Sequence, residues 1–337
     1  MSKITVLGTG SWGTILGNLL AENGHEVHLW GNNPAVIDEI NQKHTNNHYL
    51  TDFTINQSLV ADHDLAAALK DTEVVLFVVP TNAIRSVAKE ILPYLTKCEN
   101  PPILVHAAKG IELKTKLRIS EVLKTILPTE KFGEVVVISG PSHAEDVAKR
   151  DLTALTAASK DLSRAQKIQR LFGNEYFRLY TNTDVVGVEI GAALKNVIAI
   201  GAGIVHGLGY GDNTKAALMT RGLAEITRFG VKLGADPLTF SGLSGVGDLI
   251  VTCTSVNSRN WRAGNQLGQG QKLADVLEQM GQVVEGVTTA QAVHFEAKDL
   301  GVSVPITDSI YEILYEGQDL KEGIVKLMNR DLKAEFN

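Results

Sequence analysis

The sequence predicts an α/β fold in two parts: an N-terminal doubly wound domain over residues 1–183 and an all-helical domain over residues 184–337. Short apolar runs alternate with helical patterns through the first part, and strand signals end near Thr183. The length of 337 residues also exceeds what one hydrophobic core ordinarily fills. Because no Pro- or Ser-rich linker separates the parts, we expect them to pack tightly with a site between them.

The first elements form a βαβ unit. An apolar strand over Ile4–Leu7 runs into the glycines of GTGSWG at 8–13, and a helix follows because apolar side chains recur on one face over 15–20. Gly24 ends this helix. A second strand over His25–Trp30 completes a unit of about 30 residues, the usual length of this motif.

Four further apolar runs predict strands that alternate with helices, and this alternation favours a parallel sheet covered on both faces. The runs lie at Val74–Val79, Ile103–His106, Val135–Ile138 and Tyr176–Tyr180. Beyond Thr183 we expect only helices. They are an alanine- and glycine-rich apolar helix over 187–204 and further helices over 214–230, 273–280, 288–300 and 308–315.

Composition excludes several classes of function. With 32 basic and 38 acidic side chains the formal charge is −6, which argues against nucleic acid or an acidic membrane surface as a partner. Any anionic ligand must therefore be held by a few local cations. Cys98 and Cys253 have no disulfide or redox spacing, and no residues are spaced as metal ligands.

The N-terminus lacks an apolar secretion signal, so we expect the protein to remain in the reducing cytoplasm. The longest apolar tract, 186–205, contains Glu189 and Lys195. Charged residues are rare in membrane spans, so this tract is expected to be a buried core helix.

The glycines of the first turn predict a dinucleotide site. A pyrophosphate needs backbone N–H groups that nothing obstructs. Gly8 would make the tight turn, Gly10 would admit the pyrophosphate and Gly13 would let the helix pack on the strand. The alternative is a purely structural glycine-rich turn, and the strand before and the helix after favour the dinucleotide.

The end of the second strand bears on which dinucleotide is used. NAD-binding folds usually place an acidic residue there for the ribose hydroxyl, whereas this chain has Asn32 and Asn33. A 2′-phosphate would not be repelled, although no arginine is present to pair with it. We expect NADP, or use of both NADP and NAD. The alternative is that the asparagines only make the turn.

The positions of two lysines make them candidate site residues. Lys109 follows a strand and so lies at the edge where open α/β sheets bind ligands, unless it is an ordinary solvated loop lysine. Lys195 lies within the apolar helix, where burial would lower its pKa and let it exchange a proton near neutral pH. The alternative is that its tip reaches water.

Polar residues farther along complete a candidate site for hydride chemistry. Arg259 offers a planar fork suited to a phosphate or carboxylate, with Ser258 and Asn260 as neighbouring donors. Asp248 follows two glycines, and it could either pair with Lys195 or cap a helix.

Several segments are more specific than the glycine turn: GTGSWGT at 8–14, AKG at 108–110, VISGPSHA at 137–144, GVEIGAALKNVIAIGAGI at 187–204, TRGLAEITRFG at 220–230, GVGDLIVTCTS at 245–255, SRN at 258–260 and GQVVEG at 281–286. With them the whole chain resembles the bacterial NAD(P)-dependent sn-glycerol-3-phosphate dehydrogenases. The resemblance implies a Rossmann domain followed by a helical domain similar to that of 6-phosphogluconate dehydrogenase. It also implies a homodimer that reversibly reduces dihydroxyacetone phosphate to sn-glycerol 3-phosphate, the backbone of glycerophospholipids, with NADPH or NADH and no metal.

The resemblance assigns roles to individual residues. Lys195 matches the family's proton donor and acceptor, Asp248 its acidic partner, and Lys109 a further catalytic lysine. Substrate-binding positions are Lys109, Gly140, Ser142, Lys195, Asp248, Ser258, Arg259 and Asn260. Cofactor-binding positions are Gly8, Gly10, Ser11, Trp12, Gly13, Asn32, Asn33, Lys109, Ala144, Arg259, Val283 and Glu285. The chain departs from the family at Asn32 and Asn33, where many members have a basic residue or histidine, and at His143, where an aromatic residue is usual.

Overall fold

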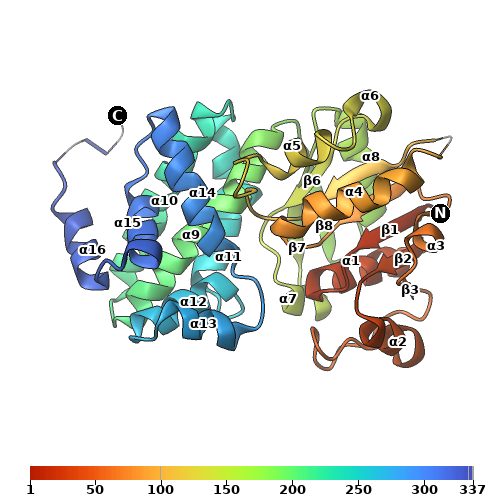
Figure 1. The fold of residues 1–337 in the computed structure, drawn as a ribbon, viewed down its shortest axis with the longest axis horizontal. Coiled ribbons are helices and arrows are strands. Elements are labelled where there is room, and N and C mark those ends of the chain that lie inside the picture. The colour runs from red at the N-terminus through yellow and green to blue at the C-terminus, as the bar shows by residue number, and fades with distance from the viewer. Residues whose placement is uncertain (99, 333, 336–337) are drawn as a thin grey trace.

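The structure, a computed structural model, describes every residue except 99, 333 and 336–337. Its strands form one sheet in the order β3-β2-β1-β4-β5-β6-β7-β8, with a helical half beside it (Figure 1). The strands are β1 (Lys3–Leu7), β2 (Glu26–Trp30), β3 (Val60–Asp62), β4 (Val74–Phe77), β5 (Ile103–His106), β6 (Val136–Ser139), β7 (Thr153–Ala158) and β8 (Phe177–Asn182).

The sheet is doubly wound, as predicted. The strands from β3 to β6 are parallel, and the chain changes direction across the sheet between β1 and β4. The expectation of an entirely parallel sheet is wrong at one edge, because β7 is antiparallel to β6 and β8 is parallel to β7. Only the short helix α7 (Ala144–Ala148) lies between β6 and β7. The chain therefore re-enters from the edge it has just left, without a crossover.

All six predicted strands are present within two residues of their expected bounds. The sequence did not predict β3 or β7. β3 has only three residues, and β7 reads TALTAA, whose small side chains form no large apolar run. Their place in the sheet comes from pairing with β2 and β6, which local sequence does not encode.

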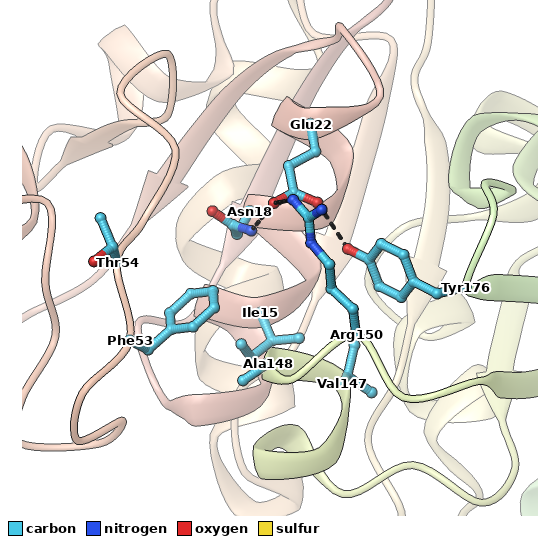
Figure 2. Close-up of a pocket in the computed structure, with 9 residues that line it drawn as sticks. All are labelled: Ile15, Asn18, Glu22, Phe53, Thr54, Val147, Ala148, Arg150 and Tyr176. Atoms are coloured by element: carbon cyan, nitrogen blue, oxygen red, sulfur yellow. Dashed lines mark hydrogen bonds and ion pairs between the residues drawn. The ribbon is translucent and has the colours of Figure 1, made fainter.

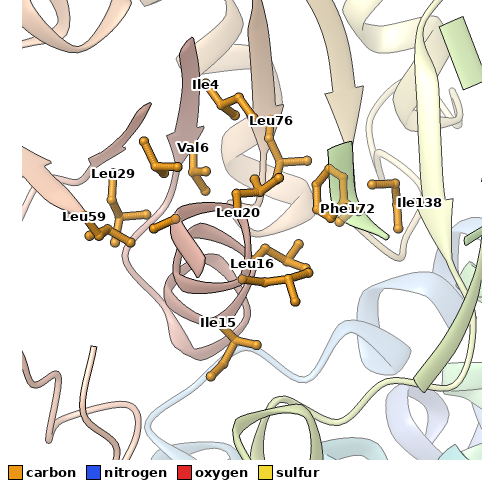
Figure 3. Packing of buried hydrophobic residues seen from close by; sticks show 14 of the residues in the cluster. Ile4, Val6, Ile15, Leu16, Leu20, Leu29, Leu59, Leu76, Ile138 and Phe172 are labelled. Atoms are coloured by element: carbon orange, nitrogen blue, oxygen red, sulfur yellow. The ribbon is translucent and has the colours of Figure 1, made fainter. Parts of the chain in front are cut away.

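Each face of the sheet carries its own hydrophobic core. One face is covered by α1 (Ser11–Glu22), α2 (Pro34–Lys43) and α8 (Leu162–Phe172), and the other by α3 (Leu65–Leu69), α4 (Ile84–Leu95) and α5 (Ile119–Lys124), with α6 (Thr129–Phe132) beside it. Figure 3 shows Ile4 and Val6 of β1 near Leu16 and Leu20 of α1 in the first core. The next residue of β1, Leu7, belongs to the second core, as the alternation of strand side chains requires.

All elements after β8 in the described residues are helical. They are α9 (Val185–Gly207), α10 (Asp212–Lys232), η2 (Pro237–Ser241), η3 (Leu243–Gly247), α11 (Asp248–Thr254), α12 (Arg259–Gly268), α13 (Leu273–Met280), α14 (Glu285–Leu300), α15 (Pro305–Tyr311), η4 (Glu312–Glu316) and α16 (Leu320–Met328). The expected helices are present, and α11, α12 and α16 were not predicted. The proposed domain boundary between residues 183 and 184 falls between β8 and α9. That the two halves are separate folding units stays a prediction.

α9 is the central helix of the second half. It is long and apolar enough to cross a membrane, but its most apolar stretch is completely buried in the protein, so it is the core helix that the sequence predicted. Close helix packing explains its small residues. A Cβ on Gly203 would lie 2.1 Å from the carbonyl oxygen of Trp261, and a Cβ on Gly264 of α12 would lie 2.0 Å from that of Ile200. The backbones of α9 and α12 therefore touch, with no room for a side chain between them.

Candidate active site

A cleft of about 1020 Å³ lies between the carboxyl edge of the sheet and the helical half. Residues that follow β1, β2, β4, β5 and β6 form one side, and α9, α11, α12 and the segment 281–288 form the other. The change of direction between β1 and β4 opens a crevice at this edge, where ligands of open α/β sheets bind. The cleft lies between the two parts, where the sequence predicts the site.

The structure brings nearly all predicted site residues to this cleft. Its lining includes Gly8, Gly10, Ser11, Trp12, Asn32, Asn33, Lys109, Ser142, Ala144, Lys195, Asp248, Ser258, Arg259, Asn260, Val283 and Glu285. Gly13 and Gly140 lie behind the wall. A Cβ on Gly13 would come within 1.9 Å of the carbonyl oxygen of Gly8, so Gly13 permits the helix to pack on the turn that follows β1, where the sequence predicted a contact with the strand itself.

The glycine turn has the geometry that a pyrophosphate needs. Gly8 has a φ of +125°, and a Cβ there would lie 2.9 Å from the carbonyl oxygen of Val78. Gly10 has nothing within 4 Å of the place where its Cβ would be, and no side chain caps the start of α1. Free N–H groups at a helix N-terminus therefore face open space, and the residues present fit a dinucleotide.

The two asparagines after β2 have different environments. The Asn33 side-chain oxygen accepts a hydrogen bond from the Ala35 N–H at 3.1 Å and so caps α2. Asn32 is exposed at the cleft. Sequence reasoning missed His48 and Tyr49, which also line the cleft. They lie in an irregular segment without periodicity, where sequence offers no signal.

Three ionisable groups from different elements meet at the cleft. The Nζ of Lys109, which follows β5, donates to Oδ2 of Asp248 at 2.9 Å, and the Nζ of Lys195 on α9 donates to Oδ1 of the same carboxylate. Lys195 is 4% exposed and Asp248, at the start of α11, is 1% exposed. The alternatives are thereby decided: Lys109 is not a solvated loop lysine, Lys195 does not reach bulk water, and Asp248 serves the lysines instead of capping a helix.

Burial sets the proton affinity of this cluster. It lowers the pKa of Lys195 to about 7, with Asp248 raising the pKa and Lys109 lowering it. Burial alone would raise the pKa of the Asp248 carboxyl, but the charges of Lys109 and Lys195 outweigh it and the pKa falls below its usual range. Lys195 therefore combines an ionised partner with a proton that can be exchanged near neutral pH.

The turn after β6 orients Lys109. The carbonyl oxygen of Gly140 accepts from the Lys109 Nζ at 3.0 Å, and the Ser142 hydroxyl lies 3.5 Å from the same nitrogen. Gly140 has a φ of +144°, and a Cβ there would lie 2.8 Å from a methyl carbon of Leu155. Only glycine fits this turn without strain, so Gly140 contributes its backbone to the site.

Some polar side chains at the start of α12 form hydrogen bonds within the protein. The Ser258 hydroxyl accepts from the Trp261 N–H at 3.2 Å and caps the helix. The Asn260 amide donates to the Asn196 oxygen at 2.9 Å and accepts from the Gly286 N–H at 2.8 Å. Arg259 points to the cleft and donates through Nη1 to the carbonyl oxygen of Val283 at 2.9 Å. No carboxylate forms an ion pair with Arg259 among the described residues.

Two further residues at the cluster were missed by sequence reasoning. Thr252, one turn after Asp248 on α11, accepts from the Lys195 Nζ at 2.8 Å through its hydroxyl oxygen. The Asn196 amide donates to the carbonyl oxygen of Lys109 at 2.9 Å. The sequence could have identified Asn196, because it is a polar residue next to Lys195 within an apolar helix.

Glu285 links the two sides of the cleft. Its Oε1 accepts a hydrogen bond from the Thr81 N–H after β4 at 3.0 Å. Burial raises the pKa of the Glu285 carboxyl above its ordinary value. Glu285, which the resemblance assigns to the cofactor site, thus forms a contact between the sheet and α14.

A second cavity, of about 250 Å³, lies on α1 away from the glycine turn (Figure 2). Arg150 and Tyr176 both donate to the Glu22 carboxylate in its wall, at 3.1 and 2.8 Å. The cavity contains none of the predicted site residues. In the part of the chain that the structure describes, no three His, Cys, Asp or Glu side chains are grouped as a metal site.

A dinucleotide turn and a buried lysine with a pKa near 7 thus share one cleft between a doubly wound sheet and a helical half. This fold and site define a nicotinamide-dinucleotide-dependent oxidoreductase.

Comparison with known proteins identifies the family. Residues 3–165 and 184–325 match the family models of the N- and C-terminal parts of NAD-dependent glycerol-3-phosphate dehydrogenase. The chain belongs to this family. A glycerol-3-phosphate dehydrogenase [NAD(P)+] of Lacticaseibacillus casei is 64% identical over all of this chain and 97% of the relative, and that of Enterococcus faecalis is 60% identical over 99% of this chain and 97% of the relative. The crystal structure of the Coxiella burnetii glycerol-3-phosphate dehydrogenase, 35% identical, superposes with a TM-score of 0.91 over 98% of this chain and 99% of that chain.

Proposed function

We propose that this protein reversibly reduces dihydroxyacetone phosphate to sn-glycerol 3-phosphate with NADPH or NADH. Family membership supports the reaction. The observation that carries the proposal is that Lys109, Asp248 and Lys195 lie in one cleft with the glycine turn and Arg259. A phosphorylated ketone needs both a proton donor and an anion site, and this cleft offers the two together.

Lys195 acts as the acid in reduction and as the base in oxidation. When bound, the nicotinamide would supply the hydride in one direction and accept it in the other. Lys195 donates a proton to the oxygen of the substrate carbon as negative charge develops there. Asp248 and Thr252 hold the lysine nitrogen in place, and its pKa of about 7 suits transfer in both directions.

The other cations position the substrate. Lys109, held by Gly140 and Asp248 with Ser142 nearby, orients and polarises the substrate oxygens. Arg259 binds the phosphate together with the backbone N–H groups at the N-terminus of α12, which Ser258 and Asn260 keep in position. Binding energy gained at the phosphate then holds the ketone for transfer.

Residues along the carboxyl edge of the sheet would hold the dinucleotide. Gly8, Gly10 and Gly13 shape the pyrophosphate turn, and the remaining contacts come from Ser11, Trp12, Asn32, Asn33, Lys109, Ala144, Arg259, Val283 and Glu285. Neither Asn32 nor Asn33 carries a charge, and Asn33 is occupied as a cap. We propose that the protein accepts NADPH and NADH.

We further propose a cytoplasmic homodimer that supplies the glycerophospholipid backbone. These points rest on the family resemblance. Light scattering of the purified protein would measure twice the 36.3 kDa chain mass if the dimer is correct, and a single chain mass would contradict it.

The test of function is the loss of nicotinamide absorbance with dihydroxyacetone phosphate and either NADH or NADPH. We expect turnover with both. An unphosphorylated 3-keto acid serves as the control, because a dehydrogenase of 3-hydroxy acids would share the glycines and Lys195 without needing Arg259. Turnover of the keto acid alone would contradict the proposal, and cofactor binding without turnover of either compound would indicate a redox sensor.

A further inference from the structure

A buried carboxylate on α9, that of Glu189, has no place in the chemistry above. Glu189 is 4% exposed, and its carboxylate accepts four hydrogen bonds. They come from the Ser120 N–H and hydroxyl, both at 2.7 Å, from Arg118 Nη1 at 2.6 Å and from His106 Nε2 at 3.1 Å. All three partners belong to the sheet half, so the carboxylate joins the two halves of the molecule.

The partners of Glu189 lie close to the catalytic cluster along the chain. His106 is the last residue of β5 and precedes Lys109 by one short turn, while Arg118 immediately precedes α5 and Ser120 lies in its first turn. On α9, Glu189 and Asn196 are two helical turns apart and therefore share one face. Asn196 donates to the carbonyl oxygen of Lys109 at 2.9 Å. One face of α9 is thus bonded at two points to the segment that leads from β5 to Lys109.

A contribution to the stability of the fold does not explain why Glu189 is buried as a carboxylate. Burial would raise the pKa of Glu189, but the hydrogen bond from His106, the charge of Arg118 and the Ser120 N–H outweigh it, so the pKa is lowered and the group is ionised. Removing an ion from water is costly, and apolar residues of similar volume often stabilise a protein as well or better. What the bonded carboxylate provides is a defined geometry between α9 and β5.

We propose that Glu189 is a positioning residue that sets the separation of the Lys109 and Lys195 amines across Asp248. The inference rests on the proposed function, because it assigns the Lys109 segment and Lys195 to one reaction. Lys109 enters the cluster from β5 and Lys195 from α9, so rotation or translation of α9 changes their spacing. A misplacement of about 1 Å can cost an enzyme about 100-fold in rate.

The test is steady-state kinetics of Glu189→Gln, with Glu225→Gln as the matched control. Glu225 is also buried, at 1% exposed, and accepts from the Ile306 and Thr307 N–H groups at 2.8 and 2.9 Å, but it caps α15 and does not line the cleft. We expect kcat of Glu189→Gln to fall about 10- to 100-fold. The KM for dihydroxyacetone phosphate should stay within about twofold, because Arg259 is untouched. Glu225→Gln should lose thermal stability and keep its kcat.

Equal kcat values in wild type, Glu189→Gln and Glu225→Gln would overturn the positioning role and leave Glu189 a structural group. If Glu189→Gln does not fold, Ser120→Ala replaces it, because it removes one of the four hydrogen bonds and keeps the charge. It should lower kcat by a smaller factor with KM unchanged, and a wild-type kcat in this variant would also overturn the proposal. A wild-type protein that does not turn over dihydroxyacetone phosphate would overturn the proposed function and this inference together.

Discussion

Lys195 illustrates how a helix determines the chemistry of one side chain. Almost every other residue of α9 is apolar or small, so the ammonium group loses the water that would otherwise stabilise it. Asp248 and Thr252 restore two contacts, and Lys109 adds a like charge on the other side of the carboxylate. The balance leaves a proton that is held less firmly than in an exposed lysine.

Lys195→Ala should remove most turnover and leave dinucleotide binding intact. General acid–base catalysis contributes about 10²- to 10⁴-fold, so kcat should fall by that factor. Cofactor affinity, measured by NADPH fluorescence titration, should be unchanged because the glycine turn lies on the other side of the cleft. Lys232→Ala, an exposed lysine at the end of α10, is the control. Near-normal kcat in Lys195→Ala would exclude this lysine as the proton donor.

The two directions of the reaction should respond oppositely to pH. The pKa of Lys195 is lowered from 10.5 to about 7, so the ammonium form that reduction uses is lost as pH rises through about 7. The neutral amine that oxidation uses increases over the same interval. Initial rates in both directions, each at saturating substrate, measure this. In Asp248→Asn the carboxylate that favours the ammonium form is gone, so the reduction profile should move to lower pH. Parallel profiles for the two directions would contradict the assignment.

Arg259→Ala should weaken substrate binding more than turnover. A hydrogen bond to a charged group is worth about 1.5–3 kcal/mol, so the KM for dihydroxyacetone phosphate should rise about 10- to 100-fold. Unphosphorylated dihydroxyacetone should show little change, since it lacks the anion. Arg228→Ala, whose side chain bonds to the carbonyl oxygen of Ser303 at 2.9 Å, is the control. An unchanged KM would remove Arg259 from the phosphate site.

Sequence reasoning identified the charged residues that occupy unusual positions and offered Asp248 as a partner of Lys195, but it missed other residues that contact the two lysines or their segments. Lys195 was recognisable because an apolar helix surrounds it, and Lys109 because it follows a buried strand. Thr252 and Asn196 contact the two lysines, and Glu189 contacts the start of α5, but these contacts join segments distant in sequence. Such contacts depend on tertiary packing, which no local pattern contains.

At the scale of elements, the contact between α9 and α12 fixes where Arg259 begins its helix. Gly203 and Gly264 let the two backbones touch, so α12 cannot move outward without opening a gap in the core. The N-terminus of α12, with Ser258 as its cap, is held at the cleft by this packing. The sequence predicted the apolar helix from its composition but treated 258–262 as an anion clamp without a helix, because that segment is short and polar.

Gly264→Ala should destabilise the protein. The added methyl would lie 2.0 Å from the carbonyl oxygen of Ile200, and overpacking of this kind costs about 1–3 kcal/mol. Chemical denaturation measures the change in the free energy of unfolding. Gly211→Ala is the control, because a Cβ there meets nothing within 4 Å, and we expect a change below about 1 kcal/mol. Equal stability of the two variants would show that α9 and α12 can separate at little cost.

At the scale of the whole molecule, the chain is acidic, but three of its basic side chains lie together at the cleft. The formal charge is −6, yet Lys109, Lys195 and Arg259 all face the cleft between the halves. The doubly wound sheet and the all-helical second half were predictable from alternation and its end near Thr183. The reversed edge pair β7–β8 was not, because strand direction depends on where the connecting chain runs and not on strand composition.

The burial of α9 also constrains synthesis of the protein. The ribosome completes α9 at Gly207, but α12 and α14, which pack on it, end only at Gly268 and Leu300. At about 5–20 residues per second, several seconds pass during which an apolar helix of membrane-spanning length lacks the cover of α12 and α14. The elements of the sheet half are complete by then, whereas Lys195 lies in a helix whose packing partners are still being synthesised. The nascent chain is therefore most prone to aggregation, and most dependent on chaperones, while its second half emerges.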